Sequence, residues 1–437
     1  MVTFKQYYKF TEGAQELALA AAREKAPAIK NKHLEHIEDE IINHGAPGVE
    51  KAFSYFSNLL DTLGGHSDEP MNITTKWDGA PAIFCGTDPI DGRFFVGTKG
   101  IFANIPKLNK SVKDIAKFHP DVEKDGEVVS KKSLRDKLTI ALTHLSKLGI
   151  KDYVVQGDML YTKNMIRKVN IDGENYLSFK PNTITYAVPA TSQLADKILQ
   201  TEIGIIFHTM YTGPTVAEMG ASFGFDASSL TQTKDVWFDD ANFKDVSGQV
   251  NLTEGETQHI RQAIEAAQNL HGQLGDVYGF INSEQCKDLA VDLKAHVNAI
   301  IRERGVFEQD PATWANQFIE RYVDKTNKAI AKLKTEAGQA KRRNAMQACI
   351  DYLRENWEDI QNLYRVYLSL IEVKMTFMQK LSNLKMMTDT FIEEPDGSFR
   401  VTDPEGFVAV DHLGSAVKLV DRLEFSKLNF MPGKKFG

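Results

Sequence analysis

The sequence predicts an α+β protein in which antiparallel sheets are combined with an N-terminal helical segment and a large inserted helical bundle. Three changes of pattern support this prediction. Apolar residues have helical spacing in 1–70, short apolar strands alternate with turns in 71–225, and the pattern is almost purely helical in 226–387. Strand patterns return in 388–437. We therefore expect the final strands to rejoin the earlier sheet, with the bundle inserted into a single domain.

The N-terminal segment reads as consecutive helices. Ala, Leu, Glu and Lys dominate 12–30, and apolar residues recur at helical steps between 32 and 42. Ala46-Pro47-Gly48 interrupts this pattern, and a further amphipathic helix ends at Gly64-Gly65.

Short strands dominate the next part of the chain. Pro81–Cys85 and Arg93–Gly97 predict a β-hairpin, and Gly204–Phe207 predicts a strand. In the bundle, apolar side chains follow one another at steps of three and four from Cys349 to Ile371. Such a stripe is more often a helical core than a cofactor site.

The composition is that of an ordinary globular protein. The 437 residues are 42% hydrophobic and 25% charged, ordinary values for globular domains. The net charge of −7 leaves no global basic field, so any polyanion site must be local. The cysteines Cys85, Cys286 and Cys349 are far apart, which predicts no disulfide framework and fits a reducing cytoplasm. No apolar run approaches the ~20 residues of a membrane span, and we expect no secretion signal.

Lys76-Trp77-Asp78-Gly79, between two predicted strands, is the sharpest chemical signal. A lysine at a strand end can be shielded from water, which lowers its pKa and makes the amine a nucleophile. An extended chain places Asp78 on the same side as Lys76, where it can orient the lysine or a ribose hydroxyl. Gly79 allows close approach of a ligand. By itself, such a tetrapeptide is more often a surface Lys–Asp pair before a turn.

This tetrapeptide resembles motif I of the covalent nucleotidyltransferases, which include ATP-dependent DNA ligases, RNA ligases and mRNA capping enzymes. In that superfamily the motif lysine attacks the α-phosphate of a nucleotide and forms a lysyl-N-phosphoamide. The resemblance implies that Lys76 is the nucleophile. It also implies a ligase-type nucleotidyltransferase fold in 70–215 and 388–425.

Other segments resemble the remaining motifs of the superfamily, in the same order along the chain. Lys99 stands where motif Ia usually has arginine, and Asp158 replaces the glutamate of motif III. Phe207 corresponds to the motif IIIa aromatic that stacks on the purine, although a core position is an equal alternative for a strand phenylalanine. Glu405 corresponds to the metal-linked glutamate of motif IV.

Motif V is only partly matched. Lys418 corresponds to its first lysine, but Val420 stands in place of the second. Either the other cation comes from Arg422 or Lys427, which are near in sequence, or activation of the α-phosphate is weaker. The resemblance implies ATP as the nucleotide, bound by Lys76, Asp78, Gly79, Lys99, Asp158, Phe207 and Lys418. It implies Mg²⁺ held by Glu405 and Asp158, and the catalytic set Lys76, Lys418 and Glu405.

The implied function is ATP-dependent polynucleotide ligation, in which AMP passes from Lys76 to the 5′-phosphate of RNA or DNA. DNA ligases and capping enzymes of the superfamily resemble each other in carrying an OB domain after motif V, and about 15 residues follow Arg422 here. We therefore expect an RNA ligase first, and a DNA nick ligase without an OB domain as the alternative. Val420 and Asp158 differ from the residues that motifs V and III usually have. These differences keep a third hypothesis open, which is a non-catalytic phage protein that retains the fold for binding.

Local basic segments could hold the polynucleotide, although solvated helix faces and a frayed tail are the simpler interpretations. These segments are Lys332–Lys334, Lys341–Arg343, and the tail residues Lys427, Lys434 and Lys435. The runs 33–39, 76–82 and 181–184 also resemble uncharacterised ligase-like proteins of tailed bacteriophages. That resemblance implies a phage protein in the cytoplasm of an infected bacterium, with no membrane partner.

Overall fold

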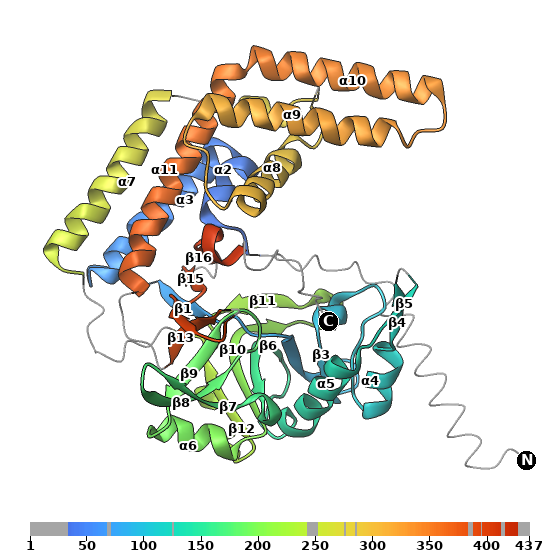
Figure 1. Cartoon of the computed structure of the whole chain (residues 1–437), viewed down its shortest axis with the longest axis vertical. Coiled ribbons are helices and arrows are strands. Elements are labelled where there is room, and N and C mark those ends of the chain that lie inside the picture. Colours follow the sequence, from blue (N-terminus) through green and yellow to red (C-terminus); the bar gives the residue numbers. More distant parts are fainter. Residues whose placement is uncertain are drawn as a thin grey trace, which may run out of the picture.

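The computed structural model describes residues 34–67, 71–124, 126–242, 252–274, 277–284, 286–382, 388–394, 396–411 and 416–426. The predicted helix at 12–30 and the basic tail residues lie outside this part of the chain. The described residues form a mixed α/β protein with antiparallel sheets and a helical body. Figure 1 shows the helical body above the sheets.

A three-stranded antiparallel sheet connects the two bodies. Its order is β1 (Asn72–Lys76), β15 (Gly406–Val410) and β16 (Ala416–Val420). Lys76 is opposite Gly406, and Val408 is opposite Lys418. The late strands therefore return to the early part of the chain and bring the Lys76 and Lys418 segments to the same small sheet.

Two larger sheets build the lower body. The six-stranded sheet follows the order β11 (Gly220–Phe223), β10 (Ile203–Thr212), β6 (Val154–Thr162), β2 (Ala82–Thr87) and β3 (Phe94–Gly97), and β12 (Val236–Asp240) pairs with β10 in parallel. The five-stranded sheet follows the order β14 (Phe399–Val401), β13 (Asp389–Glu393), β9 (Thr185–Pro189), β8 (Glu174–Phe179) and β7 (Arg167–Ile171). A separate hairpin joins β4 (Val122–Lys124) to β5 (Glu127–Val129). The helices of this body are α4 (Val112–Phe118), α5 (Lys132–Leu145) and α6 (Gln193–Gln200).

The helical body contains both the bundle and the N-terminal segment. Its elements are η1 (Ile37–Asp39), α2 (Glu40–His44), α3 (Ala46–Leu63), α7 (Glu254–Leu274), α8 (Leu289–Arg304), α9 (Pro311–Ile330), α10 (Glu336–Glu355) and α11 (Trp357–Ser382). Caps mark the starts of its long hairpin: Asp310 accepts from Thr313 N before α9, and Thr335 accepts from Gly338 N before α10. Among the helices in the described ranges, none has the length and apolar character needed to cross a membrane.

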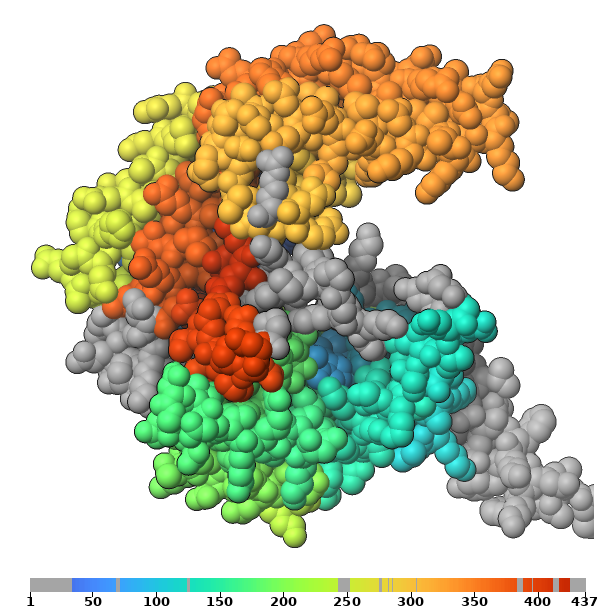
Figure 2. Space-filling model, viewed as in Figure 1, coloured from blue at the N-terminus to red at the C-terminus, as the bar shows by residue number. Residues whose placement is uncertain are grey.

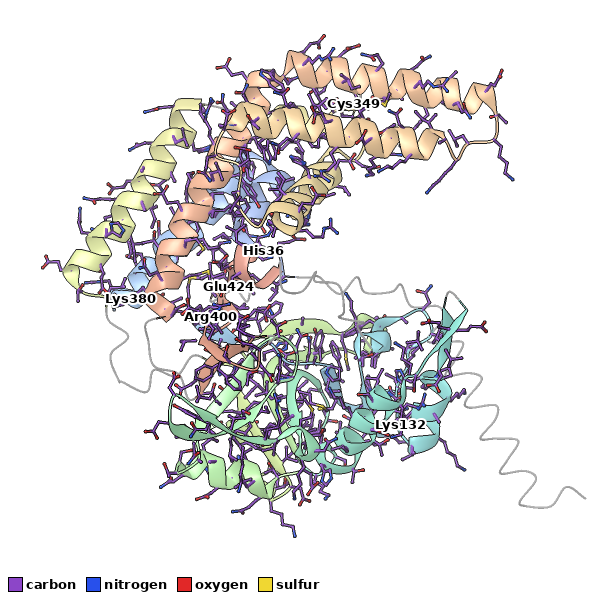
Figure 3. The ribbon with its side chains drawn as sticks, viewed as in Figure 1. His36, Lys132, Cys349, Lys380, Arg400 and Glu424 are labelled. Carbon is purple, nitrogen blue, oxygen red and sulfur yellow. A yellow bond between two sulfur atoms is a disulfide. The ribbon has the colours of Figure 1, made fainter. Side chains whose placement is uncertain are left out.

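One apolar core joins α3, the bundle and the back of the three-stranded sheet. Phe56 of α3 stacks on Phe377 of α11, with ring centroids 5.8 Å apart. Phe407 of β15 and Leu419 of β16 belong to the same core. The N-terminal helices are therefore part of the helical body. Ion pairs also connect helices of this body, and one of them joins Lys380 of α11 (Figure 3) to Glu256 of α7 at 2.7 Å.

Two expectations from the sequence need correction. The sheet does not end at 225, because β12 pairs with β10, so the insertion begins after this strand. The cysteines also do not all stay apart, since Cys286 and Cys349 form a disulfide that links the segment before α8 to α10. Their separation of 63 residues hid this contact, because the fold alone brings the two segments together. Cys85 is buried and free.

Candidate functional site

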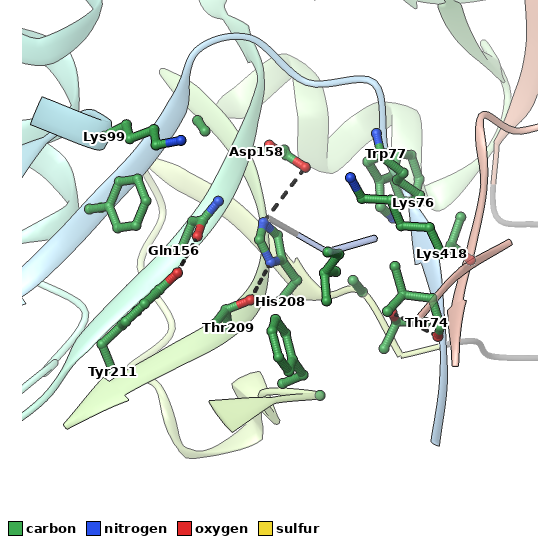
Figure 4. Close-up of a pocket in the computed structure, with 18 residues that line it drawn as sticks. Thr74, Lys76, Trp77, Lys99, Gln156, Asp158, His208, Thr209, Tyr211 and Lys418 are labelled. Atoms are coloured by element: carbon green, nitrogen blue, oxygen red, sulfur yellow. Dashed lines mark hydrogen bonds and ion pairs between the residues drawn. The ribbon is translucent and has the colours of Figure 1, made fainter. Parts of the chain in front are cut away.

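A cavity of about 320 Å³ lies between the three-stranded and six-stranded sheets. Strands β1, β15 and β16 line one wall, and β2, β6, β10 and β11 line the other. Figure 4 shows Lys76, Lys418 and Thr74 at one end, and Lys99, Gln156 and Tyr211 at the other. Asp158 and His208 lie between the two ends. The cavity therefore collects side chains from segments spread over most of the chain.

Lys76 forms an ion pair with Glu405 at its end of the cavity. It is the last residue of β1, and its Nζ lies 2.5 Å from Glu405 Oε1, in the residue just before β15. Burial alone would lower the pKa of Lys76, but attraction and hydrogen bonding to Glu405 raise it overall. Burial raises the pKa of Glu405. The structure therefore holds Lys76 as an ammonium, and not as the neutral amine that the sequence alone suggested.

Strand alternation points Lys418 into the cavity. Its neighbours Val417 and Leu419 are buried in the core of the helical body, so Lys418 takes the opposite face. Its backbone N–H donates to Glu35 O at 3.1 Å, which seats the residues before η1 beside β16. Burial and the nearby charge of Lys76 lower the pKa of Lys418. Two lysines thus face the same end of the cavity, an arrangement that suits phosphate binding.

Asp158 lies on β6 across the cavity from the lysines. Its Oδ2 is 3.8 Å from Nε2 of His208, and the Nδ1 of His208 is 2.7 Å from the Thr209 hydroxyl. Burial raises the pKa of Asp158 to about 7, and burial lowers that of His208 to about 4. His208 is therefore neutral at pH 7. For Asp158, the nearby positive charge of Lys76 does not offset the effect of burial on the pKa.

Gly79 fits tightly against Asp158. A Cβ atom added to Gly79 would lie 2.4 Å from the Cβ of Asp158 and 3.0 Å from its backbone carbon. Only a glycine allows this close approach. The predicted importance of Gly79 thus has a structural cause, which is the packing of the Lys76 loop against β6.

Asp78 has a different role from the predicted one. Its carboxylate accepts hydrogen bonds from Asn182 Nδ2 at 2.7 Å, Thr183 N at 2.6 Å and Ile184 N at 2.9 Å. Its own N–H donates to the Tyr186 hydroxyl at 2.7 Å. Asp78 is buried and does not line the cavity. It positions the loop after Lys76, and its place outside the cavity lining does not match the expected ribose contact.

Phe207 does not reach the cavity, so its assignment as the base-stacking residue is wrong. The side chain is fully buried on the other face of β10, where it packs against Phe225 and Phe238 at ring distances of 6.1 and 6.3 Å. The pairing of β10 with β6 shifts between Phe207 and Thr209. This irregularity places both His208 and Thr209 at the cavity.

The far end of the cavity holds residues that the sequence analysis missed. Tyr211 donates its hydroxyl hydrogen to Gln156 Oε1 at 2.8 Å, and its ring packs against Phe84 at 5.7 Å. Lys99, predicted from motif Ia, is exposed and lines the same end. The alternation of β6 supplied a usable signal, because Gln156 is two residues before Asp158 and shares its face.

Arg422 does not supply the second cation of motif V. It is buried in the helical body, where its guanidinium donates to Asp39 Oδ1 and the Tyr367 hydroxyl, both at 2.8 Å. Lys427, the other candidate, lies outside the described residues. In the ranges that the structure describes, no three His, Cys, Asp or Glu side chains gather into a metal-binding group.

A family model matches residues 31–434, almost the whole chain, so the protein belongs to DUF6267, a family of unknown function. Neither a curated protein nor a solved structure matches the chain.

Proposed function

We propose that this protein is an ATP-dependent polynucleotide ligase with a ligase-type nucleotidyltransferase fold, acting through a lysyl-AMP intermediate at Lys76. The observation that carries the proposal is that Lys76 and Lys418 line the same end of the cavity, with Glu405 paired to Lys76 at 2.5 Å. These residues lie on or directly beside three strands, from two distant parts of the chain. They correspond to the catalytic set that the resemblance implied.

The first chemical step joins Lys76 to the nucleotide. The ammonium of Lys76 must lose a proton, and Glu405 Oε1 at 2.5 Å is placed to accept it. Nζ then forms a bond to the α-phosphorus, while the bond from that phosphorus to the bridging oxygen breaks and pyrophosphate leaves. Lys418 faces the same end of the cavity and can stabilise the negative charge that develops on the α-phosphate.

The later steps return the lysine to its starting state. A 5′-phosphate oxygen of the polynucleotide displaces Nζ from the phosphorus, and the amine regains a proton. A 3′-hydroxyl then attacks the activated 5′-phosphate, loses its proton and releases AMP. Among ligases that the chain resembles, RNA ligases vary most in their attached domains, and a large helical body is attached here. RNA is therefore the first acceptor to test.

The proposal includes ATP and magnesium, as the resemblance implied. Asp158 lines the cavity and Glu405 contacts Lys76 at its edge, so these two carboxylates would hold the cation. Magnesium keeps several waters and needs only one or two protein carboxylates. When bound, it would help neutralise the transferring phosphate. With Phe207 in the core, Tyr211 and Phe223 are the residues placed to contact a base.

The test is transfer of label from [α-³²P]ATP, and separately GTP, to the protein in the presence of magnesium. We expect a label that survives denaturing electrophoresis and base but is lost to acid or hydroxylamine. Lys76→Ala should abolish it, because the nucleophile is gone. Lys132→Ala, an exposed lysine on α5 (Figure 3), should label as the wild type does.

Two results would contradict the proposal. One is persistent labelling of folded Lys76→Ala. The other is no label with either nucleotide in folded wild-type protein shown by mass spectrometry to carry no AMP. RNA and nicked DNA duplexes, offered separately to labelled protein, then distinguish the two ligase types.

A further inference from the structure

The distal half of the α9–α10 hairpin is the most strongly basic segment of the described chain. We call residues 321–343 the basic arm. It carries eight Lys and Arg residues against Asp324 and Glu336, a local charge of +6 in a chain whose net charge is −7. A positively charged segment in a negatively charged chain indicates a local surface that binds polyanions.

The arm contributes little to the apolar core. On α9 its buried residues are Thr326 and Ile330, and on α10 the first buried residue is Cys349, beyond the arm. Figure 2 shows the arm extending away from the bundle above a wide opening that separates it from the lower body. Core packing therefore does not account for the length and charge of this projection.

The cations on α9 form a single stripe. Arg321, Lys325, Lys328 and Lys332 follow at steps of four, three and four, and line a shallow groove on this helix together with Asp324 and Ala329. Arg321 pairs with Glu303 at 2.6 Å and Lys325 pairs with Asp292, both on α8. The stripe thus takes the α8 side of α9. In Figure 1, α8 lies between α9 and the lower body, so the stripe faces the opening.

The outer half of the stripe is uncompensated. Lys328, Lys332 and the adjacent Lys334 are exposed, and they make no ion pair with the parts of the chain that the structure describes. Along the helix axis, the stripe from Arg321 to Lys332 spans ~16 Å at 1.5 Å per residue. That length covers several consecutive phosphates of one strand.

We propose that this stripe of the basic arm binds the phosphate backbone of a single-stranded polynucleotide across the opening from the nucleotide cavity. This inference rests on the proposed function, since it assigns the surface that holds the acceptor strand. A regular row of cations suits a regular polyanion, and β11, which supplies Phe223 to the cavity, is on the side of the lower body that faces the arm (Figure 1). An irregular acidic polypeptide offers no such repeat.

The test measures binding of a fluorescent 20-nucleotide RNA by anisotropy, at several salt concentrations, with the full chain. Lys328→Gln/Lys332→Gln should weaken binding at least tenfold and reduce the slope of log K against log salt by about 1.4, which is about 0.7 for each phosphate left without its lysine. The matched control is Lys168→Gln/Lys197→Gln, which removes the same charge from exposed positions on β7 and α6. Self-labelling with [α-³²P]ATP, run without RNA, should be unchanged in both double variants.

Each outcome decides the inference. Selective loss of RNA binding in the arm variant supports it, and the same loss with single-stranded DNA extends it to both polynucleotides. Equal binding by the arm and control variants, or no binding by the wild type, overturns it. Displacement of RNA by polyglutamate at equal residue concentration would also overturn it, in favour of an acidic polypeptide. Self-labelling needs no RNA, so a negative RNA-binding result would not count against the Lys76 chemistry. In the same way, a negative labelling result would not affect the interpretation of RNA binding.

Discussion

At the scale of single residues, the cavity is organised around charges that do not balance. Lys76 and Glu405 neutralise one another, but Asp158 faces a neutral His208 across 3.8 Å and is raised to a pKa of about 7 by burial. Burial and the positive charge of Lys76 lower the pKa of Lys418. A bound nucleotide with a divalent cation would complement both the lysines and the carboxylates, which is why this end of the cavity is the reacting end in our proposal.

Asp158 gives a pH-dependent prediction. Its folded pKa is above its unfolded value, so the folded state holds the proton more tightly, and stability falls as pH rises from about 4 to about 7. Asp158→Asn removes this dependence, worth at most about 1.4 kcal/mol per pH unit. In urea unfolding without nucleotide or magnesium, the free energy of unfolding of the variant should increase relative to that of the wild type as the pH rises from 4 to 8. Asp136→Asn, at an exposed site, is the control. A constant difference between Asp158→Asn and the wild type would refute the prediction.

At the scale of elements, strand β10 shows how one irregularity decides a role. Regular alternation from Phe207 would place Thr209 on its face and His208 opposite. The shift in pairing with β6 between these residues instead turns both His208 and Thr209 to the cavity, while Phe207 stays in the core. The aromatic residue of the matched motif is therefore structural, and the residue after it is the one in the site.

Substitutions on β10 test this assignment. Phe207→Ala should lower the free energy of unfolding by about 3–5 kcal/mol, because it opens a cavity in a packed core. His208→Ala should change stability much less, since its side chain is 26% exposed, but it should lower self-labelling because it faces Asp158. Urea unfolding and the labelling assay measure the two effects. The opposite pattern, with a stable Phe207→Ala that cannot bind nucleotide, would restore the stacking role.

At the scale of the whole molecule, a buried network of charges joins the helical body to the final strand. Glu38 of η1 pairs with Lys374 of α11 at 2.7 Å, and both side chains are almost fully buried. Arg422, two residues after β16, pairs with Asp39 at 2.8 Å and donates to Asn298 of α8 at 2.7 Å. The network therefore holds β16, which carries Lys418, against three helical segments.

Breaking this network should destabilise the protein. Lys374→Met leaves Glu38 buried without its main partner and should lower the free energy of unfolding by about 3–5 kcal/mol. The double variant Glu38→Gln/Lys374→Met should recover most of the loss, because no unpaired charge remains. Lys380→Met, on the same helix but in a more exposed pair, should cost less than about 1 kcal/mol. Equal costs at positions 374 and 380 in urea unfolding would contradict this interpretation.

The alternation of apolar residues was enough to predict the mixed α and β character, the strands around Lys76, Gly204 and Phe407, and the helical bundle. These features depend on local periodicity, which the chain carries in its residue order. The resemblance to nucleotidyltransferase motifs, and not periodicity, singled out Asp158, Glu405 and Lys418 beside Lys76. In the structure Lys76, Asp158 and Lys418 line the cavity, and Glu405 pairs with Lys76.

Other features depend on contacts between distant segments and were decided only by tertiary structure. The bonding of Asp78 to Thr183, the disulfide between Cys286 and Cys349, and the pairing of Arg422 with Asp39 each join residues more than 60 positions apart. Local patterns contain no information on such partners. The turn of His208 into the cavity arises from a shift in pairing between two strands, which no single strand's periodicity encodes.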